Sequence, residues 1–252
     1  MIQQTLEYLK AMRLSVMEGE YRRQSELAAW NELSFEEKLG LLVDAEWLER
    51  KNKKLRRLLK AARLREPGAC LEGLDYSGGR GLEKALVARL SDCAWIREGR
   101  HMLITGACGT GKTYLSNAFA NAACRRGFAV KCHRVSRLLV DLQVGRGDGS
   151  WAKTLAEMKK PDLLVLDDFG LEGLKDIHCR DLLEVVDDRS PSKSVLVTSQ
   201  LPVSSWHGIF ADPTIAEAVL DRLLHRALRF ELKGPSKRLG KNVSEVDDKK
   251  SR

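Results

Sequence analysis

The stretch GACGTGKT, Gly106 to Thr113, combines glycines, a lysine and a hydroxyl residue at spacings suited to binding phosphate. It matches the pattern GxxxxGK[ST] and lies between a short apolar run, 101–105, and a helix-like stretch that starts at Tyr114. Glycines allow backbone amides to turn toward phosphate oxygens, and the start of a helix adds positive potential. A purely structural glycine-rich turn is the alternative. The strand–loop–helix context favours a phosphate-binding loop.

The motif assigns a role to several of its residues. Lys112 is expected to reach the β- and γ-phosphates, and the Thr113 hydroxyl is expected to ligate magnesium. The sequence therefore predicts ATP and Mg²⁺ as cofactors. The residues expected to bind the nucleotide are Gly106, Ala107, Cys108, Gly109, Thr110, Gly111, Lys112, Thr113 and Tyr114.

A second pattern is DLLVLDDFG, residues 162–170, in which an apolar run ends in two consecutive carboxylates. Taken alone, such a pair is usually a helix cap or a turn. After a phosphate loop, with a strand and helices between, it predicts a magnesium-binding element at the carboxyl edge of a sheet. Asp167 is expected to hold the metal directly or through water, and Asp168 to orient or deprotonate the attacking water.

A third pattern is SVLVTSQLP, residues 194–202, another apolar run that ends in polar side chains. A polar group on this strand end is placed to hold the attacking water beside the γ-phosphate. Thr198, Ser199 and Gln200 are all candidates, and an ordinary strand-to-turn ending is the alternative. We favour Gln200.

These patterns require a scaffold of alternating strands and helices. Strand-like runs at 101–105, 128–132, LLVLDD and SVLVTSQ alternate with helix-like stretches that include 114–126 and 177–188. The alternation predicts an α/β fold with a mostly parallel sheet flanked by helices.

The chain as a whole is expected to divide into four parts. A small all-helical N-terminal domain, 1–66, is followed by a linker, 67–99, that contains a helix from Leu82 to Leu90. The ATPase domain is expected at 100–240, and the tail, 241–252, is expected to be disordered because it has little to bury.

The N-terminal region shows helical periodicity. Leu6, Leu9, Met12 and Val16 repeat at three-to-four spacing, and a break is expected near Asn31. Ser34 and Glu37 then form a candidate capping box for a second, long helix.

The later part of this long helix is almost purely positive. A solvated helix face is the usual interpretation of a charge run. Here the lack of acidic residues favours contact with DNA phosphates. The basic residues are Arg50, Lys51, Lys53, Lys54, Arg56, Arg57, Lys60, Arg63 and Arg65.

Composition narrows the class of protein. The net charge of +8 and the isoelectric point near 9.2 favour an anionic partner, with nucleic acid ahead of membrane. The aromatic fraction is 6%, which argues against base stacking on single strands. No apolar run is long enough to span a bilayer, so we expect a cytoplasmic protein without a membrane partner. The six cysteines form no CxxC pair and predict buried thiols rather than a zinc site or disulfides.

Several stretches together resemble the IstB group of AAA+ ATPases, which assist transposition of bacterial insertion sequences and are related to DnaC-type helicase loaders. The resemblance covers most of the chain, to about Leu239, and its N-terminal part distinguishes the IstB group from the loaders. The stretches that carry it are GACGTGKTYLSNAFANAACRRG, LLVLDDFG, VLVTSQLPVSSWH, VLDRLLHRA, LSFEEKLGLLVDAEWLERKNKKLRRLLKAARL and LEGLDYSGGRGLEKALVARL.

The resemblance implies roles for three arginines. Arg222, in LDRLLHR, matches the segment that supplies an arginine to the ATP of a neighbouring subunit, with Arg226 as the reserve. Arg238 resembles a C-terminal arginine that acts near the γ-phosphate in cis. Pro235 and Lys237 depart there from the family's GESYR-like pattern. Asp168 stands where AAA+ proteins commonly have glutamate.

The expected function is that of a homo-oligomeric, Mg²⁺-dependent ATPase that binds double-stranded DNA and assists a cognate transposase. The nearest alternative is a DnaC-like loader of a replicative helicase. A nucleotide-gated DNA scaffold that barely hydrolyses ATP is a third possibility, which the acidic pair argues against. A small-molecule kinase is a fourth, and no segment resembles an acceptor-binding lid.

Overall fold

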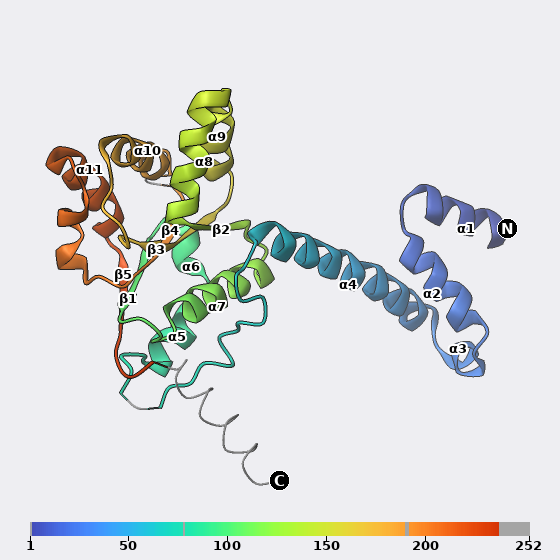
Figure 1. Cartoon of the computed structure of the whole chain (residues 1–252). Coiled ribbons are helices and arrows are strands. Elements are labelled where there is room, and N and C mark those ends of the chain that lie inside the picture. Colours follow the sequence, from blue (N-terminus) through green and yellow to red (C-terminus); the bar gives the residue numbers. More distant parts are fainter. Residues whose placement is uncertain (1, 78, 190–191, 237–252) are drawn as a thin grey trace, which may run out of the picture. The chain divides into compact units, whose positions relative to one another are not determined.

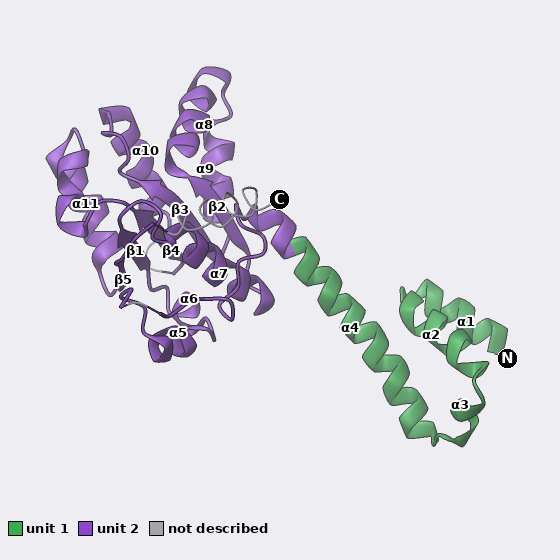
Figure 2. Ribbon diagram, turned by 60° about the horizontal axis from the view of Figure 1, so that its bottom comes forward, with its two compact units in different colours: residues 1–57 green, residues 58–252 purple. Residues whose placement is uncertain are grey.

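The computed structural model describes residues 2–77, 79–189 and 192–236. The chain divides into two compact units, residues 1–57 and 58–252, coloured separately in Figure 2. The division falls inside a long helix rather than at residue 66. Residues 67–99, expected to be a linker, belong to the second unit.

The first unit is helical. It contains α1 (Ile2–Ala11), α2 (Ser15–Ser25), α3 (Ala28–Glu32) and the first part of α4 (Phe35–Ala62). The helical spacing from Leu6 to Val16 belongs to two helices, because Arg13 adopts the left-handed conformation, with φ of 61°, between α1 and α2. Periodicity did not reveal this break, since apolar residues continue at helical spacing across it.

The start of α4 confirms the predicted capping box. The Glu37 amide donates to Ser34 Oγ over 3.2 Å, and the Ser34 amide donates to the Glu37 carboxylate over 2.8 Å. Two amides at the helix start are thereby satisfied, which fixes where α4 begins.

The second unit contains a five-stranded sheet with the strand order β2-β3-β4-β1-β5. All the strand pairs are parallel. The strands are β1 (Met102–Gly106), β2 (Val130–Arg134), β3 (Leu163–Phe169), β4 (Ser194–Ser199) and β5 (Leu228–Leu232). The predicted α/β architecture is confirmed, whereas β5 was not predicted, because LRFEL has only two inward-facing buried residues.

Helices cover both faces of this sheet, and Figure 1 shows α8 and α10 on one side with α7 and α5 on the other. These helices are α5 (Lys84–Leu90), α6 (Ala94–Arg97), α7 (Lys112–Arg125), α8 (Val135–Asp148), α9 (Trp151–Lys159), α10 (Asp176–Asp187) and α11 (Pro213–Leu224), with short 3₁₀ turns at Val203–Ser205 and His207–Ile209.

Each face of the sheet has its own apolar layer. Residues of α8, α9, α10 and α11 pack with Leu164, Leu166 and Val197 on one side. On the other side, Phe119 of α7 lies against Trp95 and Phe230, with ring centroids 6.5 and 5.8 Å apart. The two-sided burial explains why β1, β3 and β4 are almost continuously apolar.

Within the described residues, no helix is both long enough and apolar enough to cross a membrane. Three of the cysteines, Cys93, Cys124 and Cys179, are buried. Cys108 is exposed, so the expectation of buried thiols is wrong for the cysteine in the phosphate loop.

Candidate nucleotide-binding site

The GxxxxGKT motif forms a loop between β1 and α7, as its sequence context indicates. Gly106 packs so tightly that an added Cβ would lie 2.3 Å from the Leu232 carbonyl oxygen. Gly111 has φ of 95°, a conformation that favours glycine, and leads directly into α7 at Lys112. Gly109, with φ of 80°, also adopts a conformation that favours glycine, so backbone geometry requires all three glycines of the loop.

Lys112 is largely buried and remains close to the loop. It is 6% exposed, and its Nζ donates to the Ala107 carbonyl oxygen over 2.8 Å. Thr110 also donates to this carbonyl through its hydroxyl, over 2.8 Å. These contacts hold the loop in a curved conformation around the lysine.

Asp167 and Asp168 lie near the end of β3, where the pairing with β4 is irregular between Leu166 and Phe169. Asp168 has φ of 62°. Consecutive residues of a regular strand point to opposite faces, but both of these carboxylates contact the same nitrogen of Arg65. The irregularity places two adjacent acids on one side of the strand.

The Asp167 carboxylate connects three elements of the site. It accepts hydrogen bonds from the hydroxyl of Thr113 in α7, over 3.2 Å, and from that of Thr198 in β4, over 2.5 Å. The Thr198 hydroxyl also accepts from the Asp168 amide, over 3.0 Å. Thr198 thus positions the acidic pair, a role that differs from the water-holding role considered from the sequence.

Two arginines contact the acidic pair. Arg65 Nη1 lies 2.6 Å from Asp167 and 3.2 Å from Asp168, and Arg134 Nε lies 2.9 Å from Asp168. The hydrogen bond to Asp167 raises the pKa of Arg65, against the opposing effect of burial. Arg65 therefore remains cationic beside the carboxylates.

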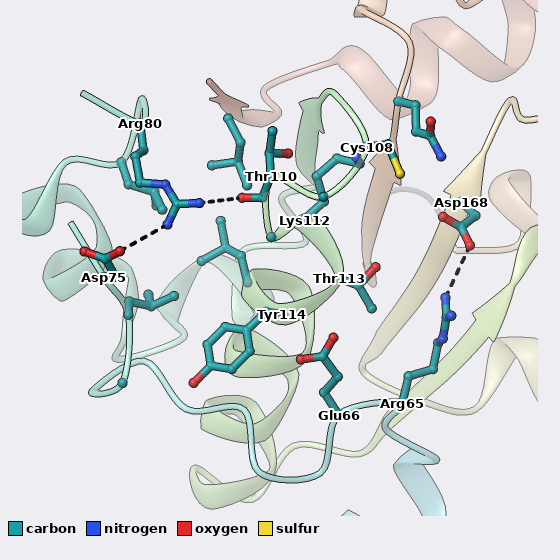
Figure 3. A pocket seen from close by; sticks show the side chains of 18 of the residues that line it. Arg65, Glu66, Asp75, Arg80, Cys108, Thr110, Lys112, Thr113, Tyr114 and Asp168 are labelled. Carbon is teal, nitrogen blue, oxygen red and sulfur yellow. Dashed lines mark hydrogen bonds and ion pairs between the residues drawn. The ribbon is translucent and has the colours of Figure 1, made fainter. Parts of the chain in front are cut away.

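A pocket of about 500 Å³ brings these groups together, and Figure 3 shows Lys112 and Thr113 between Asp168 on one side and Tyr114 on the other. Gln200 also lines the pocket, at the end of β4. Of the residues predicted from the phosphate loop, Cys108 to Tyr114 line it directly. The loop, the acidic pair and the β4 end therefore meet at the carboxyl edge of the sheet.

The far side of the pocket is formed by the segment expected to be a linker. Arg80 donates to the Thr110 carbonyl oxygen over 3.1 Å and pairs with Asp75 at 3.6 Å (Figure 3). Leu74 and Leu82 add apolar surface to the same pocket. This segment passes along β5, where the Lys233 amide donates to the Arg80 carbonyl.

The residues present fit a nucleoside triphosphate with magnesium. The Thr113 hydroxyl and the Asp167 carboxylate are oxygen ligands that Mg²⁺ favours, and they already lie side by side. Lys112, Arg80 and Arg65 supply positive charge in the pocket. The pocket volume is also that of a small-molecule site.

Arg222 and Arg226, two of the arginines taken from the family resemblance, do not line this pocket of their own chain. Arg222, in α11, pairs with Asp187 at 2.6 Å and donates to the Ala218 carbonyl oxygen. Arg226 follows α11 with φ of 53°. Arg238 and the tail, 241–252, lie outside the described residues.

The sequence prediction missed several residues of the site. Arg65 was included only as part of a basic run, and Arg80 and Arg134 were not considered. Arg134 directly ends β2, so its place beside the β3 acids was available from strand order once β2 and β3 were known to be neighbours. No local signal identified Arg65, which contacts residues more than a hundred positions away.

Comparison of the sequence with protein families and with known proteins gives clear matches. The profile described as IstB-like ATP binding protein matches residues 7–245. A Pseudomonas fluorescens protein named for ATP binding in insertion sequence IS1162 is 45% identical over 205 residues, covering 81% of this chain and 89% of the relative. The Sinorhizobium fredii insertion-sequence ATP-binding protein y4pL is 41% identical over 234 residues, covering 93% and 95%.

Solved structures show the same fold at low identity. The DnaC helicase loader superposes with a TM-score of 0.55 at 21% identity, covering 66% of this chain and 97% of that chain. The replication initiator DnaA, solved with AMPPCP and single-stranded DNA, gives a TM-score of 0.55 at 19% identity, covering 72% and 56%. These similarities place the core among AAA+ P-loop folds.

Proposed function

The chain belongs to the IstB-like ATP-binding protein family, which is AAA+ in fold, and we propose that it hydrolyses ATP and assists a transposase of its insertion sequence on duplex DNA. The observation that carries the proposal is the convergence of Lys112, Thr113 and Asp168 on one pocket, with Asp167 hydrogen-bonded to the Thr113 hydroxyl. A scaffold that only binds nucleotide needs no acid positioned for an attacking water.

Each residue has a role that its place supports. Lys112 contacts the β- and γ-phosphates, while Thr113 and Asp167 hold Mg²⁺, which supplies positive charge to the phosphates when bound. Asp168, whose backbone amide donates a hydrogen bond to the Thr198 hydroxyl, orients the attacking water. Gln200 lines the same pocket and is placed to assist that water.

Hydrolysis is proposed to occur between subunits of a homo-oligomer. Arg222 is the proposed arginine that one subunit supplies to the ATP of the next, by its match to the family segment. Its guanidinium is held by Asp187 at 2.6 Å and is about one-third exposed. An arginine held this way keeps a fixed direction while remaining accessible to a neighbouring subunit.

Duplex DNA is the proposed nucleic-acid partner, bound through its phosphates. In the later part of α4, Lys53, Lys54 and Arg57 are exposed and have no carboxylate within ion-pair distance among the described residues. Arg50 and Arg56 are paired with Glu46 and Glu49. Unpaired exposed cations are available to a polyanion and predict little base readout.

The partner protein is proposed to be the cognate transposase, because the relatives are proteins of insertion sequences. A DnaC-like helicase loader is the second candidate, which the fold similarity to DnaC over nearly that whole chain favours. The insertion-sequence relatives, at 45% and 41% identity, favour the first.

The test is the ATPase rate with and without duplex DNA, with particle size followed by light scattering. We expect DNA and ATP together to drive assembly and raise turnover. If neither the particle size nor the rate responds to DNA, the DNA proposal fails. Assembly on a partner protein, as for a helicase loader, then becomes the preferred function.

The interface proposal has a separate test. Arg222→Ala should bind ATP normally and hydrolyse it slowly, and mixing it with Lys112→Ala subunits should restore part of the rate, because each supplies what the other lacks. Asp187→Asn is the matched control, since it removes the ion pair and keeps the arginine. Mixtures with no recovered turnover would contradict a role of Arg222 in trans.

A further inference from the structure

Arg65 occupies the acidic centre of the site. Its Nη1 lies 2.6 Å from Asp167, the proposed magnesium ligand, and 3.2 Å from Asp168. Arg134 contacts Asp168 alone, at 2.9 Å. The two arginines have similar exposed fractions, 46% and 44%, so they differ mainly in whether they contact Asp167.

The backbone around Arg65 is held by the helix that follows the phosphate loop. Asn117, which is 2% exposed, accepts hydrogen bonds from the amides of Arg65 and Glu66, at 2.9 and 3.4 Å. The same side chain donates to the Thr113 carbonyl oxygen at 2.6 Å. One turn farther along α7, Asn121 donates to the Pro67 carbonyl at 3.5 Å.

This anchoring gives Arg65 a fixed relation to Thr113, because both are tied to the same turn of α7. Buried amides that satisfy backbone groups are costly to displace. Among the described residues, the side chain of Arg65 is hydrogen-bonded to the two carboxylates alone. Its guanidinium can therefore move while its backbone stays in place.

The Asp167 carboxylate already has three partners, namely the hydroxyls of Thr113 and Thr198 and the guanidinium of Arg65. A divalent cation held by Thr113 and Asp167 must lie beside both oxygens. Two positive groups at one carboxylate repel each other strongly at short distance. Mg²⁺ and Arg65 therefore compete for Asp167.

We propose that Arg65 is an internal counter-ion of the acidic pair that binding of Mg²⁺ with a nucleoside triphosphate displaces. Without metal, Arg65 neutralises carboxylates that would otherwise repel the triphosphate. With metal, its guanidinium leaves Asp167, while Arg134 stays on Asp168. The exchange moves the Arg65 side chain, while the backbone of this segment keeps its bonds to Asn117.

The experiment measures binding of a fluorescent ATP analogue to the full chain as Mg²⁺ is titrated, and again in EDTA. This inference rests on the proposed function of the pocket. For Arg65→Gln we expect half-maximal metal-dependent binding at an about three- to tenfold lower Mg²⁺ concentration, since a half-exposed ion pair is partly screened. In EDTA we expect the same variant to bind the analogue several-fold more weakly.

The two expected changes run in opposite directions, since the variant needs less Mg²⁺ but binds more weakly in EDTA. This combination distinguishes a displaced counter-ion from other roles of Arg65. An arginine that contacted phosphate, or one needed only for folding, would weaken binding in both conditions. Arg134→Gln is the matched control, with the same charge change in the same pocket, and its Mg²⁺ requirement should shift less than that of Arg65→Gln. Weaker binding of Arg65→Gln at all Mg²⁺ concentrations, or no change in either condition, would overturn the proposal.

Two further arms make the result decisive. If Arg65→Gln does not fold, Arg65→Met keeps the aliphatic stem without the charge and must show the same two shifts. A wild-type chain that binds no nucleotide would contradict the proposed function itself. Wild-type binding that depends on Mg²⁺, together with an Arg65 variant that behaves like the wild type, would contradict this inference alone.

Discussion

The nucleotide pocket and the later part of α4 are both rich in positive charge, but they hold it differently. In the pocket, Arg65 and Arg134 are paired with buried or half-buried carboxylates at 2.6 to 3.2 Å. On α4, Lys53 and Arg57 are exposed and unpaired among the described residues. Each charge in the pocket has a specific partner, so replacing a single residue there is expected to change nucleotide binding or turnover. Unpaired charges on a helix surface contribute to DNA binding through their total, so replacing one of them is expected to change it little.

The largest effect is expected from Lys112→Ala. Removing a buried cation from the phosphate loop should lower nucleotide affinity and turnover by about two orders of magnitude or more. Binding of a fluorescent nucleotide and release of phosphate measure this, and thermal unfolding checks that the fold remains. Normal turnover in a folded variant would contradict the phosphate-loop assignment. The contrast between the pocket and the later part of α4 would then no longer hold.

The second effect concerns α4. Lys53→Glu combined with Arg57→Glu should weaken DNA binding about tenfold for all sequences alike and reduce the salt slope by about two. Lys53→Gln alone should cost only about twofold, because many cations share the contact. Fluorescence anisotropy at several salt concentrations measures both.

The matched control for α4 is Lys84→Glu with Arg89→Glu, the same charge change at two exposed positions of α5. This α5 variant should weaken DNA binding less than the α4 variant does. A salt slope that is unchanged in the α4 variant would mean that this helix binds a protein instead.

A smaller, pH-dependent effect is expected in the core from His101. This residue is 4% exposed, and its Nδ1 accepts a hydrogen bond from the Val195 amide over 3.1 Å. Burial, together with the charges of Arg189 and His225, lowers the pKa of His101 from 6.5 to about 4. The folded chain then binds fewer protons than the unfolded chain between these values, so stability is full above pH 6.5 and falls toward pH 4.

His101→Asn keeps an acceptor that does not titrate, and it should make thermal stability less dependent on pH in this window. Unfolding midpoints at pH 5 and pH 7.5 provide the measurement. Equal pH dependence in the variant and the wild type would show that another group governs the acid response.

The smallest effect is expected in the helical unit. Glu46 of α4 accepts hydrogen bonds from the amides of Val16 and Met17, at 3.0 and 3.1 Å, and so caps α2 from another helix. Burial acts to raise the pKa of Glu46, but the bonds from Arg50 and from these two amides lower it overall. Glu46→Gln should cost about 1 kcal/mol, the usual scale of a helix cap.

Hydrogen exchange at the Val16 and Met17 amides reports this loss locally. Glu49→Gln, which breaks only an exposed pair with Arg56, is the control and should leave both amides protected. Equal loss of protection in the two variants would mean that Glu46 acts through general helix stability rather than as a cap.

Local pattern was sufficient for the features that depend on neighbouring residues. The phosphate loop, the capping box at Ser34 and the apolar strands β1, β3 and β4 were predicted because glycines, caps and buried runs act over a few residues. The break at Arg13 and the strand β5 were missed. The former interrupts an unbroken apolar spacing, and the latter is a short edge strand with alternating polar residues.

The sequence by itself determined the residue types proposed to bind phosphate and magnesium, because their chemistry requires a fixed local spacing. Only the tertiary structure decided which groups surround them. Strand order brought Arg134 beside Asp168, and an irregularity in β3 turned two consecutive acids to one side. Asn117 brought Arg65 to Asp167 from a distant part of the chain. Such long-range contacts depend on how whole elements pack, which no local pattern records.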